Sequence, residues 1–364
     1  MKISTLLVVV TVLFIAYMLS TINTSADTPL TGYAHTKSHI IIGSMDGALT
    51  DYQVKFIVHK GSGTDNSSDA YLNGVSQSWP YDIRFTDSEY DLLSYWVESS
   101  DADTAVVWVK VPSIPAYPGY ATVYLYYGRS GDSGASDGLA TFDFFDDFTG
   151  VAGANIGGNN GWVWYNPFGH SNYQWKYSSP TGYAVQTIDS AVYNGKGGAI
   201  IHPGAQGNIM IEERIAAITD VGLHPNNRCE MGFSRDATTY NAYGIGWSDI
   251  YYRGFNVTNV VGGTAYGYET TTKADFNYHI YGCARQGTTV YTYYDGTLMG
   301  NMTGCSNTYY AIFAMSDAAF STSNSIDWFR ARQYTPNEPQ HSVWGSNGVD
   351  LSVSGDDVSF EKVV

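Results

Sequence analysis

Apolar and polar side chains alternate along short segments in the first third of the chain. The segment DYQVKFIVHK places four apolar side chains on one side of an extended backbone, namely Tyr52, Val54, Phe56 and Val58. The segment TAVVWVKVP, which begins at Thr104, alternates in the same way. A period of two residues is typical of a strand with one buried face, so this region predicts a domain built from sheets.

A small, polar segment, GRSGDSGASDG, separates this region from a second one and predicts a linker. Beyond it, further strands are predicted as far as Tyr334, with turns at GGNNG, YDGT and VGGTAYG. The segment IMIEERIAAI predicts a strand because Ile209, Ile211 and Ile215 alternate with other residues. We therefore predict an all-β fold of two consecutive antiparallel β-sandwiches, residues 30–140 and 142–336.

The end of the chain reads GVDLSVSGDDVSFEKVV and predicts one more hairpin. Val349, Leu351 and Val353 alternate, SGDD supplies a turn, and a second strand follows. A lone hairpin is only marginally stable in water. We therefore expect residues 346–364 to be the truncated start of a third β domain, packed poorly against the two sandwiches.

The N-terminus has the features of an export signal. Lys2 precedes an apolar run from Leu6 to Leu19, and small residues before Asp27 suit cleavage after Ala26. Residues 1–26 are thus predicted to be a signal peptide, with an uncleaved membrane anchor as the alternative. Four glycosylation sequons agree with export, at Asn23, Asn66, Asn256 and Asn301. We expect an extracellular or cell-surface glycoprotein, held at a membrane only by an uncleaved signal or by a C-terminal anchor after the tail.

The charge and the cysteine content limit the binding partners, disulfides and metal sites that the chain can have. With 18 basic and 34 acidic residues, the net charge of −16 argues against nucleic acid as a partner, because binding it requires a basic surface. Three cysteines allow one disulfide, and their spacing matches no metal motif. Cys283 and Cys305 bracket a predicted hairpin and are the expected pair.

Five blocks in order resemble a known family. They are YDIRFTD, LLSYWVE, AVVWVKVPSI, VYLYYG and FDFFDDF, spread over about a hundred residues. Together they resemble the domain of unknown function 2341, found in exported archaeal and bacterial surface proteins. This resemblance implies a location and an architecture but no reaction.

Later blocks resemble a concanavalin A-like jelly roll, the fold of many lectins and glucanases. They are NIMIEERI, EMGFSRD, YHIYGCARQGTTVYTYYDG and SIDWFRARQY, the last of which resembles the closing strand. The tail from Gly348 resembles the first strands of an immunoglobulin-like adhesion repeat.

Because such jelly rolls include glycoside hydrolases, the carboxylates of the second region are candidate catalytic groups. Those enzymes place two acids on one face of a strand, in spellings such as E-x-D-x-E, and the sequence contains none. Glu212 and Glu213 are neighbours, which point to opposite faces of a strand. No H-E-x-x-H, G-x-S-x-G or phosphate-binding glycine loop occurs either. The sequence therefore predicts a protein that is not an enzyme.

The stretch TFDFFDDFTG lies where the first sandwich ends and the second begins. Jelly rolls that close the N-terminal strand on the C-terminal strand often hold a structural Ca²⁺ there, with oxygen ligands from both ends. Asp147 and Asp327 match those two ends. They are the predicted calcium ligands, and the alternative is that these aspartates cap turns or are solvated.

Two segments combine aromatic rings with amides, GNNGWVWYNPFGHSNYQW and YGIGWSDIYYRGF. Sugars stack their C–H faces on such rings while planar polar groups take their hydroxyls. The predicted ligand-binding residues are Trp162, Trp164, Tyr165, Asn166, Trp247, Tyr252 and Arg253. The alternative for each ring is packing in the sandwich core.

These observations predict a non-catalytic module of the cell surface that binds glycans or mediates adhesion. A structural spacer in a cell envelope or S-layer is the main alternative, with a glycan or another envelope component as the partner. A glycoside hydrolase of unusual signature is a weaker one.

Overall fold

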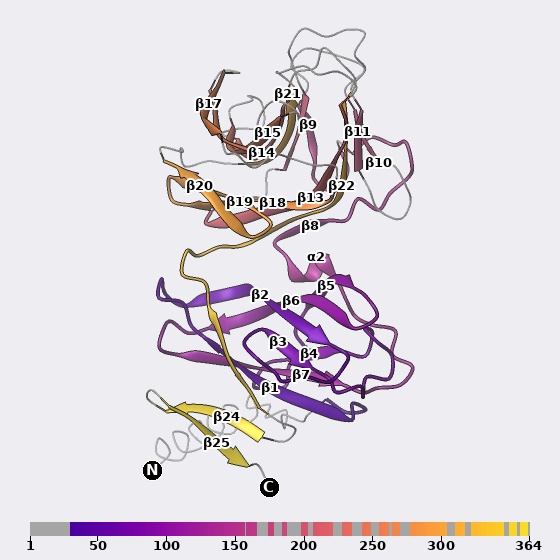
Figure 1. Cartoon of the computed structure of the whole chain (residues 1–364), viewed down its shortest axis with the longest axis vertical. Coiled ribbons are helices and arrows are strands. Elements are labelled where there is room, and N and C mark those ends of the chain that lie inside the picture. Colours follow the sequence, from indigo (N-terminus) through magenta and orange to yellow (C-terminus); the bar gives the residue numbers. More distant parts are fainter. Residues whose placement is uncertain are drawn as a thin grey trace, which may run out of the picture.

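The computed structural model describes residues 30–156, 158–165, 174–177, 184–187, 198–202, 207–220, 228–234, 242–248, 255–261, 264–269, 277–303, 310–316, 322–345, 349–354 and 357–362. The predicted signal peptide lies outside these residues. Among the described residues, no helix has the length and apolar character needed to cross a membrane. Strands dominate the fold and form two stacked sandwiches (Figure 1).

The first sandwich has two four-stranded sheets. One has the strand order β23 (Gln340–Trp344), β1 (His35–Ile42), β7 (Tyr120–Tyr127) and β4 (Arg84–Thr86). The other has the order β3 (Asp69–Tyr71), β2 (Leu49–His59), β6 (Thr104–Ile114) and β5 (Tyr95–Ser100). The four alternating side chains predicted on β2 are all buried between these sheets, as the period of two residues requires.

The second sandwich has a larger pair of sheets. One contains β10 (Gln174–Tyr177), β11 (Ala184–Thr187), β22 (Thr322–Gln333), β13 (Ile209–Asp220), β18 (His279–Gln286), β19 (Thr289–Tyr294) and β20 (Thr297–Met302), with β8 (Phe144–Asp146) paired to β22. The facing sheet contains β17 (Thr264–Glu269), β16 (Phe255–Val261), β15 (Ala242–Ser248), β14 (Arg228–Ser234), β21 (Tyr310–Ser316), β12 (Gly198–His202) and β9 (Val163–Tyr165). The short helix α2 (Gly138–Thr141), capped by Asp137, leads into β8.

The prediction of an all-β chain with two consecutive antiparallel sandwiches is confirmed. The segment IMIEERIAAI forms β13, a strand as predicted. Its residues Ile209, Ile211 and Ile215 are all buried between the two large sheets. One pairing in the first sandwich, between β2 and β3, is parallel.

The second sandwich interrupts the first one in the sequence. No predicted domain contains Gln340–Trp344, yet this segment forms β23 and pairs with β1 at the edge of the first sandwich. Trp344 covers the first core, with its ring centroid 4.1 Å from that of His39 and 5.8 Å from that of Phe56. The chain therefore leaves the first sandwich after β7, builds the second one, and returns to complete the first.

The tail forms the predicted hairpin. β24 (Val349–Ser354) pairs with β25 (Asp357–Lys362), and these two strands make a separate sheet. Figure 1 shows the hairpin below the first sandwich, and β24 lies near β1. The immunoglobulin-like identity of this segment stays a prediction.

Candidate functional site

Trp162, a predicted ligand-binding residue, is a core residue. Its side chain is 1% exposed and packs against Phe148 and Phe329 inside the second sandwich. Its indole Nε1 donates a hydrogen bond of 2.8 Å to the Asp146 carboxylate. The predicted contact with a glycan is therefore wrong for this ring, because it has no face open to solvent.

The other predicted ligand-binding residues remain untested. Trp164 and Tyr165 belong to β9 and Trp247 to β15, but their side chains lie outside the described part of the structure. The remaining three residues, Asn166, Tyr252 and Arg253, lie outside it altogether. Their role in glycan binding stays a prediction.

Of the predicted calcium ligands, Asp147 directly follows β8 and Asp327 lies on β22, the strand with which β8 pairs at the seam between the sandwiches. β8 pairs with β22 in a register that aligns Asp146 with Phe329. Asp327 forms an ion pair with Arg214, and the exposed Asp147 accepts a hydrogen bond of 3.0 Å from the backbone N–H of Thr149. The calcium site stays a prediction, which an unchanged melting curve on adding Ca²⁺ or chelator would contradict.

The predicted disulfide is likewise untested. Cys283 is buried on β18, with its sulfur 3.4 Å from the carbonyl oxygen of Met231. Cys305 lies outside the described residues.

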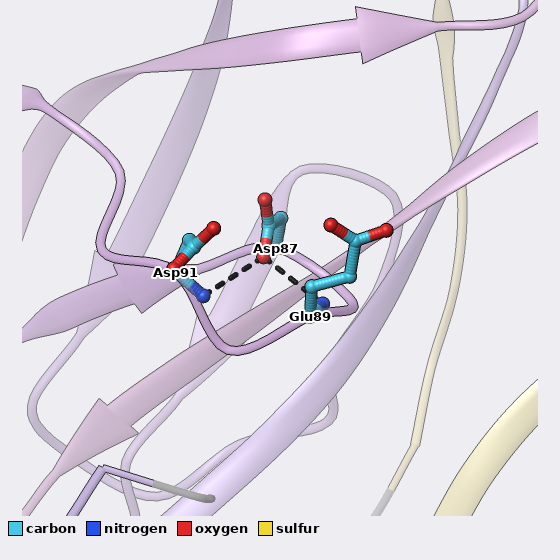
Figure 2. Close-up of side chains that lie close together, drawn as sticks. All are labelled: Asp87, Glu89 and Asp91. Carbon is cyan, nitrogen blue, oxygen red and sulfur yellow. Dashed lines mark hydrogen bonds between the residues drawn. The ribbon is translucent and has the colours of Figure 1, made fainter. Parts of the chain in front are cut away.

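A loop of the first sandwich brings three carboxylates together, Asp87, Glu89 and Asp91 (Figure 2). Asp87 Oδ1 accepts hydrogen bonds from the backbone N–H groups of Glu89 and Asp91, at 3.0 and 2.9 Å. This turn geometry explains why the three side chains are close. Exposed acidic loops of this kind occur in many proteins without a metal.

The adjacent glutamates of β13 face opposite sides of their sheet, as strand alternation predicts. Glu213 points into the core of the second sandwich, is 0% exposed, and has no hydrogen-bond partner for either oxygen among the described residues. Burial raises the pKa of its carboxyl well above the ordinary value of 4.5. Glu212 points to the outer face, toward the first sandwich.

On that outer face, Glu212 belongs to a buried charge network at the domain junction. Arg330 Nε donates to Glu212 at 2.8 Å, and Arg330 Nη1 donates at 2.7 Å to Glu98, on β5 of the first sandwich. Arg332 Nε donates to Glu212 at 3.2 Å. Burial acts to raise the pKa of Glu212, but the charges of Arg330 and Arg332 outweigh it and lower that pKa to about 2.

Aromatic rings enclose the Arg330 guanidinium. Its central carbon lies 4.2 Å from the ring centroid of Trp108, on β6, and 4.5 Å from that of Trp328, on β22. Gln53 of β2 also joins the two sandwiches, since its side chain accepts from the Gln333 N–H and donates to the Thr141 carbonyl. These contacts fix the two sandwiches against each other. Sequence reasoning missed the junction, because neither sandwich alone shows which of its surface residues are covered.

Two hollows open beside this network. The first, which we call the seam cleft, has a volume of about 520 Å³. Its lining includes Trp96, Asp137, Leu139, Asp147, Asn160 and Tyr177. It therefore combines one half-buried indole ring with carboxylates and an amide, and it contains one residue that the sequence singled out, Asp147.

The second hollow, which we call the junction slot, has a volume of about 440 Å³. Its lining includes Lys55, Trp108, Tyr293, Arg332, Tyr334 and Glu338. Both volumes fall in the range of about 300–1,000 Å³ that is usual for small-molecule sites, which often lie between domains.

Comparison with known families supports part of the predicted resemblance. Residues 79–166 match the domain of unknown function DUF2341. The match extends from the loop before β4 to the end of β9, so it crosses the seam between the two sandwiches. No curated protein matches the chain as a relative.

Solved structures resemble the chain only distantly. One of them comes from work on endo-acting O-glycanases of the human gut microbiota that initiate mucin breakdown. It is 12% identical to this chain, has a TM-score of 0.41, and the match covers 53% of this chain and 100% of the other. The carbohydrate-binding module CBM66 of Bacillus subtilis is 12% identical with a TM-score of 0.36, over 50% of this chain and 99% of its own. The β-glucanase of Bacillus licheniformis is 16% identical with a TM-score of 0.38, and the match covers 52% of this chain and 98% of the glucanase. Similarities at this level transfer neither a site nor an activity.

Proposed function

We propose that this chain is a non-catalytic glycan-binding module of a cell surface, in which the two sandwiches act as one rigid body. The observation that carries the proposal is the seam cleft. An indole ring offers the flat apolar face on which a sugar stacks, and carboxylate and amide groups accept and donate to its hydroxyls. Trp96, Asp147 and Asn160 supply these groups within one hollow.

The carboxylates on and near the cleft favour binding over catalysis. Asp146 is buried, and each of its two oxygens already accepts a hydrogen bond, one from the Phe148 N–H and one from the Trp162 indole. Asp137 caps α2, and Asp147 caps the turn at Thr149. A glycosidase needs one acid that donates a proton and a second that stays ionised across the scissile bond.

A glycan array of the full chain tests the proposal. We expect binding to neutral oligosaccharides that weakens about tenfold in the variant Asp147→Ala, because a charge-assisted hydrogen bond is lost. The matched control is Glu89→Ala, another exposed acid in a turn, which should bind as the unaltered protein does. The proposal fails if the unaltered chain binds no glycan, and the site is misplaced if Asp147→Ala leaves binding unchanged.

A structural spacer is the second candidate function, and the Arg330 network favours it. A buried ion-pair and aromatic junction holds two domains rigid whether or not either binds a ligand. A chain that binds nothing on the array and still unfolds as a single cooperative unit would support the spacer. Release of reducing sugars from polysaccharides would instead support the hydrolase.

A further inference from the structure

The junction slot is built from both sandwiches. Lys55 of β2 and Trp108 of β6 line it from the first sandwich, and Ile280 of β18 and Tyr293 of β19 line it from the second. Arg330 and Arg332 of β22 also line the slot, and the connection between β22 and β23 contributes Pro336 and Glu338. The slot therefore exists only when the two sandwiches are assembled.

The wall from the second sandwich is aromatic and carries hydroxyl groups. Tyr293 is partly exposed, and its hydroxyl lies 3.0 Å from that of Tyr334. Met210 and Ile280 line the same wall. An apolar surface edged by two hydroxyls suits a ring that has one C–H face and several hydroxyl groups, which is the chemistry of a sugar unit.

Three basic and three acidic residues line the slot, and Lys55 is the basic one that has no ion pair among the described residues. Glu212 is paired with Arg330 and Arg332, Glu338 is paired with Arg332 at 3.0 Å, and Asp295 lies 2.6 Å from His279. Lys55 is exposed, and its ammonium lies 5.9 Å from the Trp108 ring centroid. Among the described residues no acidic side chain forms an ion pair with Lys55.

We propose that the junction slot is a second binding site, which takes a sugar unit bearing a carboxylate. The carboxylate pairs with the Lys55 ammonium, and the sugar ring packs against Tyr293 with its hydroxyls near Tyr334. The inference shares the ligand class of the proposed function but uses a different cleft. Its acidic ligand is compatible with the net charge of −16, because salt largely screens charges that lie more than about 10 Å from the Lys55 ammonium.

Calorimetric titration of the full chain tests the slot, with oligogalacturonate as the acidic probe and its methyl-esterified form as the neutral one. We expect Lys55→Gln to weaken binding of the acidic probe about tenfold, because one charge-assisted contact is lost, and to reduce its salt dependence. Lys60→Gln, which removes a lysine just beyond the end of β2, is the matched control and should leave both unchanged. Since Lys55 is exposed, its variant should fold normally, which the melting curve checks.

Three results would overturn the inference: no binding of the acidic probe, equal binding of the two probes, or unchanged binding in Lys55→Gln. Failure of the seam cleft has a separate signature. Asp147→Ala would then leave neutral glycans unaffected while Lys55→Gln still weakened the acidic probe. If the seam cleft binds glycans and the junction slot does not, Asp147→Ala would weaken binding of neutral glycans while Lys55→Gln left binding of the acidic probe unchanged.

Discussion

Replacing Glu213 by methionine should stabilise the protein, although it removes a charged residue type from the chain. The side chain is fully buried on β13 between Ile211 and Ile215, and its register neighbours on the adjacent strands are Tyr281 and Phe329. All four neighbours belong to the apolar core. Methionine has nearly the same length and fills the same space without polar atoms.

The expected magnitude has a constant part and a part that depends on pH. A buried polar group without a partner costs about 1–3 kcal/mol, and Glu213→Met removes that cost at every pH. Burial also raises the pKa of Glu213 well above 4.5, so the folded protein keeps a proton that the unfolded chain has lost. Between these two pKa values the folded state binds more protons. The contribution of Glu213 to stability therefore falls as pH rises, by about 1.4 kcal/mol per pH unit above its unfolded pKa.

Urea unfolding of both proteins at pH 5, 6 and 7 measures this effect. The free energy of unfolding of the variant should exceed that of the unaltered protein, and the difference should grow with pH until the folded protein loses the proton. Glu212→Gln is the matched control on the same strand. Glu212→Gln should destabilise the protein, because it removes the carboxylate charge with which the buried Arg330 and Arg332 are paired. A difference that is independent of pH, or a destabilised Glu213→Met, would show that Glu213 has a stabilising partner.

Three further predictions concern the junction, the returning strand and the tail. Glu98→Gln should lower the free energy of unfolding in urea by about 3–5 kcal/mol, because it breaks the buried pair with Arg330; no loss would mean that the pair contributes nothing. His39 and His341, whose ring nitrogens are 2.9 Å apart between β1 and β23, both have a lowered pKa, chiefly because of burial. These two rings bind more protons in the unfolded chain below about pH 6.5, so their contribution to the free energy of unfolding should fall as pH drops from 7 to 5. A His39→Leu variant with the same pH dependence as the unaltered protein over this range would contradict the assignment. Deleting residues 348–364 should leave the melting temperature nearly unchanged, because the hairpin forms a separate sheet; a large decrease would show that the hairpin supports the first sandwich.

The local alternation of apolar residues was sufficient to predict β2, β6, β13 and the tail hairpin. The buried positions of β2 and the buried isoleucines of β13 follow from a period of two residues, since successive side chains of a strand point to opposite faces. The same rule placed Glu212 and Glu213 on opposite faces of one sheet. The two-sandwich architecture followed from these strands and from the linker between them.

Only the tertiary structure decided what covers each face. Alternation does not reveal that Gln340–Trp344 returns to pair with β1, because strand pairing between distant segments depends on the whole fold. Alternation also could not distinguish Trp162, which is buried in a core and hydrogen-bonded to Asp146, from a ring that is exposed to a ligand. Nor could it show that Arg330 of one sandwich is neutralised by Glu98 of the other, since charge pairing is set by proximity in space rather than in sequence.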